Sequence, residues 1–291
     1  MPRELRHPAA RPGCRDCGGL GLVVARQDEL AVARACACVG VCPLCQGTGL
    51  VASGESFRAP RRRCACQAVA QRARSFDAVG IPARHSDSTR ASFVTSSKHQ
   101  TAVQGAISRW LTEFDPGREN RGFVLYGEVG RGKTHLMVAL LRELVLLHGV
   151  SARFVEFSHL LADLKAGFDA GRGAAELLDP LVRVEVLAID ELGKGRNTEF
   201  EATVVDELVS RRYNAMRPLL ATTNYTPAPP TGRPVANAAE AQLGTAVLPT
   251  LADRVGDRVM SRLRETCDFV EVKGDDWRET SRGRRPRAGT R

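Results

Sequence analysis

From Thr101 onward, short apolar stretches alternate with longer segments in which apolar residues recur every three or four positions. The short stretches predict strands at residues 122–127, 152–157, 184–190, 218–224 and 268–272. The longer segments predict helices at about 101–114, 133–148, 158–168, 199–216 and 250–264. This alternation predicts an α/β domain with a parallel, doubly wound sheet, which we place at residues 101–273.

The remaining sequence divides by composition. Residues 1–75 are rich in cysteine, and the polar residues 76–100 are expected to form a linker. Residues 226–249, rich in Pro, Ala and Gly, predict a flexible insertion, and the Arg-rich residues 274–291 predict a disordered tail. The sequence lacks a secretory apolar region near its start and an uninterrupted apolar run of ~20 residues. We therefore expect a cytoplasmic protein that does not enter a membrane.

Eight of the nine cysteines form a pattern, C-x2-C-x18-C-x-C, that repeats after 28 positions. Four thiolates supplied as two close pairs are the ligands of a structural zinc. Disulfides need an oxidising compartment, and redox catalysis typically uses a single C-x-x-C, so we predict two structural zinc sites. The repeat favours sequential ligation, although an interleaved arrangement of the four pairs stays open. The sequential sites are Cys14, Cys17, Cys36 and Cys38, followed by Cys42, Cys45, Cys64 and Cys66.

Positive charge is concentrated in this cysteine-rich segment. Residues 1–75 hold 12 Arg and 5 acidic residues (12 − 5 = +7), whereas residues 76–273 hold 24 basic and 25 acidic residues (24 − 25 = −1). Eight thiolates and two Zn²⁺ would lower the first surplus to about +3. The run Arg61–Cys64 is a candidate contact for nucleic-acid phosphates. Alternatively, these arginines form a solvated surface, since the chain uses 37 Arg and only 5 Lys.

The segment GEVGRGKT, residues 127–134, matches the phosphate-binding pattern G-x-x-x-x-G-K-[ST]. A predicted strand precedes it and a predicted helix follows, which is the context that the pattern requires. Gly127, Gly130 and Gly132 leave backbone N–H groups open to a phosphate, and the helix N-terminus adds its dipole. We expect Lys133 to reach the β- and γ-phosphates of ATP and Thr134 to bind Mg²⁺.

Two further strands end in polar residues. VLAIDE, residues 186–191, places Asp190 where it can hold Mg²⁺ through water and Glu191 where it can polarise an attacking water. This second carboxylate favours ATP hydrolysis over transfer of phosphate to a small acceptor. LLATTN, residues 219–224, places Asn224 to orient that water or to sense the γ-phosphate.

These motifs resemble, in order, those of the DnaC/DnaI-type replicative helicase loaders and the related IstB-type transposition ATPases. The likeness rests on GEVGRGKTH, VEFSHLLADLK, VLAIDELG, RRYNAMRPLLATTN and VMSRL, and it covers roughly residues 105–273. It implies an AAA+ P-loop NTPase fold, ATP with Mg²⁺, and assembly of neighbouring subunits. The cysteine-rich N-terminal module also resembles the DnaI-type loaders, in which this region contacts the helicase. The doubled module and the long insertion depart from the family pattern.

Arg254, Arg258 and Arg262 recur every four residues along the last predicted helix, so they are expected to share one face. Such a row is usually the solvated face of an amphipathic helix. The resemblance implies a different role for one of them, because the Arg of the SRL element corresponds to Arg262 and acts on the ATP of a neighbouring subunit. Arg258 is the second candidate for this role.

The leading interpretation is an AAA+ ATPase that loads or remodels a replicative ring helicase on single-stranded DNA. The helicase would be contacted through the zinc module. One alternative is an IstB-type transposition helper. A zinc module that docks a partner fits the loader better than this alternative. Another alternative is a zinc-dependent nucleic-acid-binding adaptor that binds nucleotide without hydrolysing it. The intact Glu191 favours an enzyme over such an adaptor.

Overall fold

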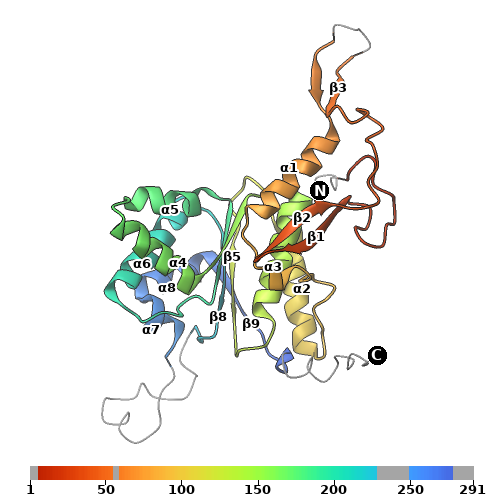
Figure 1. The fold of residues 1–291 in the computed structure, drawn as a ribbon. Helices are drawn as coiled ribbons and strands as arrows, with labels where there is room; N and C mark the ends of the chain where they lie inside the picture. The colour runs from red at the N-terminus through yellow and green to blue at the C-terminus, as the bar shows by residue number, and fades with distance from the viewer. Residues whose placement is uncertain (1–5, 55–58, 228–248, 278–291) are drawn as a thin grey trace, which may run out of the picture. The chain divides into compact units, whose positions relative to one another are not determined.

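The computed structural model describes residues 6–54, 59–227 and 249–277, and it divides into two compact units (Figure 1). The N-terminal unit comprises the chain up to Ser92 together with Val138–Arg153, and the sheet unit comprises Phe93–Met137 and the chain from Phe154 onward. Most of the predicted insertion (226–249) and of the predicted tail (274–291) lies outside the described residues.

Each cysteine repeat contains one β-hairpin. β1 (Leu22–Gln27) pairs antiparallel with β2 (Leu30–Ala35) in the first repeat, and β3 (Leu50–Ala52) pairs antiparallel with β4 (Arg61–Arg63) in the second. Both hairpins lie between the second and third cysteine of their repeat. The hairpin therefore accounts for the 18-residue spacing, because it returns the chain to the first pair of cysteines.

The chain from the end of the second repeat into the predicted linker (76–100) contains helices and buried side chains. α1 spans Ala65–Asp77, a 3-10 helix spans Ala83–His85, and the side chains of Val79 and Ile81 between them are fully buried. Backbone N–H groups of the first hairpin donate to the Ile81 carbonyl (2.8 Å) and to Asp77 Oδ1 (2.7 Å). The buried packing of this segment was not predicted, because the segment is mostly polar and only a few of its residues are apolar and buried.

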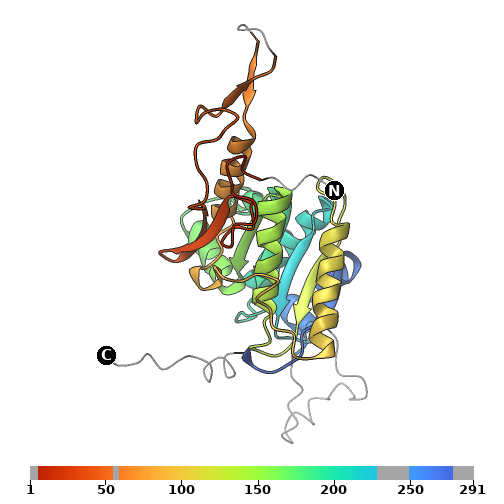
Figure 2. The ribbon, with the colours of Figure 1, turned by 90° about the vertical axis from the view of Figure 1, so that its right-hand side faces the viewer.

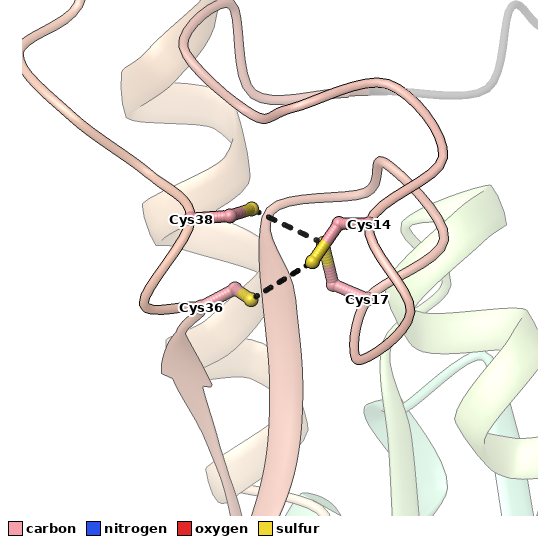
Figure 3. Close-up of side chains that lie close together, drawn as sticks. All are labelled: Cys14, Cys17, Cys36 and Cys38. Atoms are coloured by element: carbon pink, nitrogen blue, oxygen red, sulfur yellow. Dashed lines mark hydrogen bonds between the residues drawn. The ribbon is translucent and has the colours of Figure 1, made fainter.

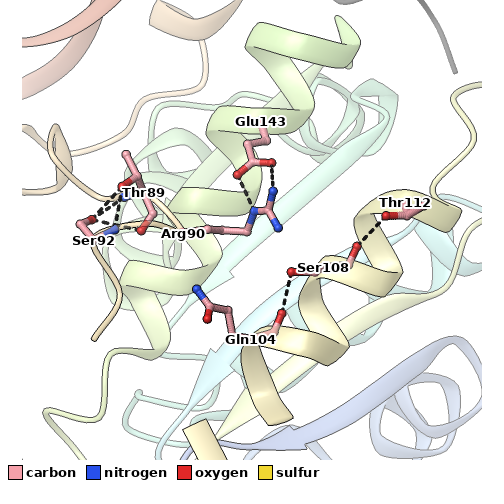
Figure 4. A network of polar contacts seen from close by, with 7 residues as sticks. All are labelled: Thr89, Arg90, Ser92, Gln104, Ser108, Thr112 and Glu143. Carbon is pink, nitrogen blue, oxygen red and sulfur yellow. Dashed lines mark hydrogen bonds and ion pairs between the residues drawn. The ribbon is translucent and has the colours of Figure 1, made fainter. Parts of the chain in front are cut away.

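The predicted helix 133–148 is an α-helix, α3 (Lys133–Glu143), followed by a π-helical turn at Leu144–His148. Within the N-terminal unit, the Arg72 guanidinium donates to the carbonyls of Leu146 (2.9 Å) and Leu147. Arg90 forms two hydrogen bonds of 2.5 and 2.8 Å with the Glu143 carboxylate (Figure 4). Arg72 thus supplies donors near a helix end, where carbonyls lack partners in the helix itself, whereas Arg90 pairs with a side-chain carboxylate.

In the described residues of the sheet unit, five strands form one sheet in the order β6-β7-β8-β5-β9. The strands are β5 (Gly122–Tyr126), β6 (Ala152–Glu156), β7 (Val186–Asp190), β8 (Leu219–Thr223) and β9 (Cys267–Glu271). The pairs β7–β8, β8–β5 and β5–β9 are parallel, as predicted. Since β8 lies between β5 and β7, the carboxyl ends of these three strands meet at one edge of the sheet.

Helices cover both faces of this sheet (Figures 1 and 2). One face packs on α4 (Phe157–Asp169), α5 (Ala174–Arg183), α6 (Glu199–Asn214), α7 (Leu251–Val255) and α8 (Asp257–Thr266), which share a large buried cluster with the strands. On the other face, Trp110 of α2 (Lys98–Glu113) packs against Phe123, with ring centroids 5.0 Å apart. α5 was not predicted; it contains Pro180 but buries Leu178 and Leu181.

Cys267, the cysteine outside the repeats, begins the edge strand β9. Its side chain is 2% exposed, and its Sγ lies 3.6 Å from the Leu219 carbonyl oxygen. Burial raises the pKa of this thiol to about 11. Cys267 therefore packs as a small apolar residue of the core.

Candidate nucleotide site and metal centres

The predicted phosphate loop connects β5 to α3. Lys133, the first residue of α3, is only 7% exposed, and its Nζ donates to the carbonyls of Gly127 (2.7 Å) and Glu128 (2.6 Å). The loop thus wraps around the ammonium group. This arrangement places one fixed positive charge at the N-terminus of a helix, where a phosphate is stabilised both by that charge and by the helix dipole.

Glycine is required at both ends of the loop for steric reasons. Gly127 has φ 139°, and a Cβ there would lie 2.5 Å from the Val272 carbonyl oxygen. Gly132 has φ 85°, and a Cβ there would lie 2.8 Å from the Phe93 ring. Any side chain at either position would push the loop away from neighbouring backbone or ring atoms, so the motif's glycines set its close packing.

Asp190, the last residue of β7, contacts the hydroxyl of Thr134, its predicted partner in Mg²⁺ binding, and also that of Thr222, which was not predicted. Thr134 Oγ1 donates to Asp190 Oδ1 at 2.9 Å, and Thr222 Oγ1 donates to the same oxygen at 2.5 Å. Burial raises the pKa of Asp190, and these two hydrogen bonds act in the opposite direction. A hydroxyl and a carboxylate oxygen in contact form a donor set that suits Mg²⁺.

Glu191 follows at the end of the same strand in a left-handed conformation, with φ 56°. Its backbone N–H donates to Thr222 Oγ1 (2.9 Å), and its carboxylate forms an ion pair with Lys194. Lys194 Nζ also lies 3.9 Å from Glu156 Oε1. The carboxylate predicted to polarise water is therefore engaged by a lysine three residues later, a contact that the sequence motifs did not indicate.

Removing this lysine is expected to raise the turnover of ATP. Because an exposed ion pair stabilises a side-chain position by only ~0.2–1 kcal/mol, Lys194→Ala should increase kcat about 1.4- to 5-fold with KM for ATP unchanged. Steady-state ATPase kinetics measure this, with Lys165→Ala at an exposed position of α4 as the control. A fall in kcat for Lys194→Ala would contradict a restraining role.

Asn224, the third predicted site residue at this edge, lies one position beyond β8 and is exposed. The two threonines before it are buried, and Thr223 Oγ1 donates to the Leu192 carbonyl at 2.8 Å. Thr222 and Thr223 thus connect β8 to the end of β7. The role of Asn224 toward water or phosphate stays a prediction.

The three arginines predicted on one helix do not form a row. Gly256, with φ 84°, separates α7 from α8, so the expected single helix at 250–264 was wrong. Arg254 donates to the Gly193 carbonyl (2.9 Å), whereas Arg258 is exposed. Arg262 pairs with Asp206 of α6 at 2.8 Å. The break allows Arg254 and Arg262 to contact different elements, and the action of Arg262 on a neighbouring subunit stays a prediction.

A further contact, on the phosphate loop itself, was not predicted from the sequence. The Trp277 N–H donates to the Gly130 carbonyl at 3.1 Å, and the Asp276 carboxylate lies about where a Cβ on Gly130 would stand, at 2.2 Å. Both residues belong to the segment that we predicted to be a disordered tail. Its first four residues, 274–277, are instead placed along the phosphate loop.

The eight repeated cysteines form two groups of four, in the sequential arrangement that the repeat favoured. Within each group the sulfur atoms lie within 4.8 Å of one another. In the first group, the closest sulfur pairs are Cys14–Cys36 at 3.8 Å and Cys17–Cys38 at 3.6 Å (Figure 3). In the second group, they are Cys42–Cys64 at 3.7 Å and Cys45–Cys66 at 3.6 Å.

These distances fit zinc and exclude disulfides. Zn–S bonds of ~2.3 Å in a tetrahedron separate the sulfurs by about 3.8 Å, whereas a disulfide requires about 2.05 Å. The backbone N–H groups of Cys17 and Asp16 lower the pKa of the Cys14 thiol to about 6, and the Gly21 N–H donates to Cys17 Sγ at 3.3 Å. Such donors stabilise the thiolates that a metal requires.

We expect about two zinc ions per chain, each held by one group. Cys14→Ser/Cys38→Ser removes two ligands from one group and should leave about one zinc, whereas Cys14→Ser/Cys45→Ser damages both groups and should leave none. Metal analysis of the purified variants measures the difference. Equal zinc content in the two double variants would contradict independent sites.

Comparison with known proteins gives a consistent result. Residues 99–284 match the family model described as IstB-like ATP binding protein. The replicative helicase loader DnaC of Escherichia coli (strain K12) is 28% identical over 152 residues, covering 52% of this chain and 61% of that protein. DnaC of Buchnera aphidicola subsp. Acyrthosiphon pisum (strain APS) is 33% identical over 121 residues, covering 40% of this chain and 48% of that protein. The match thus spans less than two thirds of either relative.

Solved structures show the same fold. The crystal structure of the DnaC helicase loader superposes with a TM-score of 0.54 and 24% identity, covering 65% of this chain and 99% of that one. AMPPCP-bound DnaA from Aquifex aeolicus gives a TM-score of 0.50 and 18% identity, covering 65% of this chain and 51% of that one.

A parallel sheet of this strand order, with a phosphate loop after β5 and Asp190–Glu191 at the end of β7, defines a P-loop NTPase of the AAA+ class. The chain belongs to the IstB-like ATP binding protein family. The predicted fold and the resemblance are thereby confirmed. In the described part of the chain, no helix has the length and apolar character needed to cross a bilayer.

Proposed function

We propose that this protein hydrolyses ATP in order to load or remodel a replicative ring helicase on DNA. The observation that carries the hydrolysis is the contact of Thr134 with Asp190 beside the buried Lys133, with Glu191 as the next residue. The likeness to DnaC, which is named a replicative helicase loader, supports a replicative helicase as the target of this activity.

Each side chain has a defined task in this proposal. Lys133 binds the β- and γ-phosphates and neutralises charge on them, while Thr134 and Asp190 hold Mg²⁺. Bound Mg²⁺ supplies electrostatic stabilisation of the phosphate oxygens. Glu191 accepts a hydrogen bond from the attacking water and polarises it, and Asn224 orients that water.

The proposal includes assembly and two macromolecular partners. Arg262 completes the site of a neighbouring subunit, so hydrolysis depends on contact between chains. The helicase is engaged through the N-terminal cysteine module, and single-stranded DNA is the strand onto which it is loaded. DnaA, which shares the fold at 18% identity, has been solved bound to AMPPCP and single-stranded DNA, which is compatible with this arrangement.

A second candidate is a transposition helper ATPase, which the match to the IstB-like family model favours. It would use the same nucleotide site, with a transposase as partner in place of the helicase. A nucleotide-binding adaptor without hydrolysis is a third possibility. The presence of Glu191 beside Asp190 argues against it.

The test uses the purified full chain and the replicative helicase of the same organism. With ATP and circular single-stranded DNA, we expect the two proteins to co-elute and the helicase to be transferred to the DNA, as measured by its unwinding of an annealed oligonucleotide. Lys133→Ala should abolish the transfer, because it removes the cation that binds the phosphates. Binding to a transposase with none to the helicase would favour the second candidate.

A further inference from the structure

The 28-residue repeat allows the two cysteine groups to be compared position by position. We call the first group with the β1–β2 hairpin knuckle 1, and the second with the β3–β4 hairpin knuckle 2. Val41 and Leu44 of knuckle 2 occupy the positions of Gly13 and Asp16 in knuckle 1. All four positions are exposed, and Val41 and Leu44 are 72% and 60% exposed. Only knuckle 2 therefore presents large aliphatic side chains there.

The hairpins have diverged in the same direction. Leu22, at the start of β1, is 6% exposed, whereas its counterpart Leu50 is 43% exposed. Ala33 of β2 is buried and its N–H donates to Asp77, so knuckle 1 packs on its own unit. The counterpart of Ala33 is Arg61, and all of β4 (Arg61–Arg63) is exposed. Knuckle 1 uses these positions for internal packing, whereas knuckle 2 exposes them.

Exposed Val41, Leu44 and Leu50 lie within ten residues on a knuckle whose four sulfurs lie within 4.8 Å of one another. Single exposed apolar residues are common, but several on one small module indicate an interaction site. Burying them removes apolar area from water, which stabilises a complex. From Cys42 to Cys66 the sequence holds four Arg and one acidic residue, so an acidic surface complements it.

These features favour a protein over a nucleic acid. Proteins that hold single strands without base-specific contacts stack bases on aromatic rings. The described residues of knuckle 2 contain aliphatic side chains and no aromatic ring; Phe57 lies outside them. Aliphatic residues beside arginines suit a segment with apolar residues on one side and carboxylates around them.

We propose that knuckle 2 docks an acidic, apolar-faced segment of a partner protein, and that knuckle 1 serves as its structural support. The partner's identity as the ring helicase rests on the proposed function. Leu44, Val41 and Leu50 supply the apolar contact, and Arg61 and Arg63, which share the hairpin face of Leu50, pair with carboxylates of the partner. Since such pairs are exposed at the rim, the association weakens as salt increases.

The test transfers the residues of knuckle 1 into knuckle 2. Val41→Gly/Leu44→Asp in the full chain should weaken binding to the helicase at least ~10-fold, as expected for central apolar contacts. Arg63→Glu, directly opposite Leu50 in the hairpin, should also weaken binding and reduce its salt dependence. Asp16→Ala in knuckle 1 is the matched control and should leave the affinity unchanged. Two zinc ions and wild-type ATPase activity in each variant verify that the fold is retained.

Two further probes separate the outcomes: a labelled helical peptide with a Leu face flanked by Glu, and a 20-nucleotide oligo(dT). If the wild-type chain binds the peptide and Val41→Gly/Leu44→Asp does not, the docking surface is supported. If the peptide binds in this way but the helicase does not, only the proposed function fails. The docking surface is overturned if the wild-type chain binds neither the helicase nor the peptide. It is also overturned by an affinity that the double variant leaves unchanged, or by binding to oligo(dT) alone.

Discussion

Glu191→Gln is expected to slow ATP hydrolysis by about 10²- to 10⁴-fold while ATP still binds. The substitution keeps the shape of the side chain but removes the charge that polarises the attacking water. Lys133 and the Thr134–Asp190 contact are unaffected, so the phosphate site is retained. Single-turnover hydrolysis and the equilibrium binding of a fluorescent ATP analogue measure the two properties separately.

Glu199→Gln, at the exposed start of α6, is the control and should retain normal turnover. The ion pair adds a second check. If Lys194 acts only by restraining Glu191, Lys194→Ala should have no additional effect in the Glu191→Gln background. Turnover near the wild-type rate in Glu191→Gln would exclude Glu191 as the base.

Arg262→Ala is expected to depress hydrolysis by ~10³-fold with nucleotide binding nearly intact, if Arg262 stabilises charge on the γ-phosphate of a neighbour. Mixing Arg262→Ala with Lys133→Ala protein should then restore part of the activity. In the mixture, one chain offers an intact phosphate loop and the other an intact arginine. ATPase assays of the variants alone and mixed, with co-assembly verified by sedimentation, measure this effect.

The contact with Asp206 adds a requirement to that prediction. Arg262 is held at 2.8 Å from Asp206 and lies over the Tyr213 ring of its own chain, so it must leave these partners to reach another subunit. Asp206→Asn weakens the ion pair between Arg262 and Asp206 and should not reduce hydrolysis. A co-assembled mixture that stays inactive would exclude Arg262, and Arg258 would be tested next in the same way.

The parts of this molecule that depend on local chain geometry could be predicted from the sequence. The glycines of the phosphate loop and the spacing of the cysteines are needed for the same local reasons in any sequence context. The position of Lys133 in that loop and the grouping of the cysteines in fours could therefore be predicted, whereas their roles toward nucleotide and metal stay predictions. The parallel, doubly wound sheet also followed from the alternation of strands and helices, whereas its strand order was not predicted.

The parts that depend on tertiary contacts could not be predicted. Pro180 discouraged a helix at 174–183, yet burial of Leu178 and Leu181 stabilises one there. The periodicity at 250–264 continued through Gly256, whose positive φ breaks the helix. Arg212 is 1% exposed and donates to carbonyls that include those of Leu181 and Pro218. In a chain so rich in Arg, nothing in the sequence separates this buried residue from solvated ones.

The burial of Cys267 makes this thiol an internal reporter of how often the nucleotide-binding domain opens. A thiol-modifying reagent can reach it only when β9 separates from its neighbours, so its labelling rate follows the population of opened molecules. The label on this cysteine is identified by peptide mass, separately from the eight in the knuckles. Ligands that bind the closed domain should slow its labelling. Nucleotides and partner proteins can therefore be ranked by how strongly each slows the labelling of Cys267 in the wild-type chain, without an engineered probe.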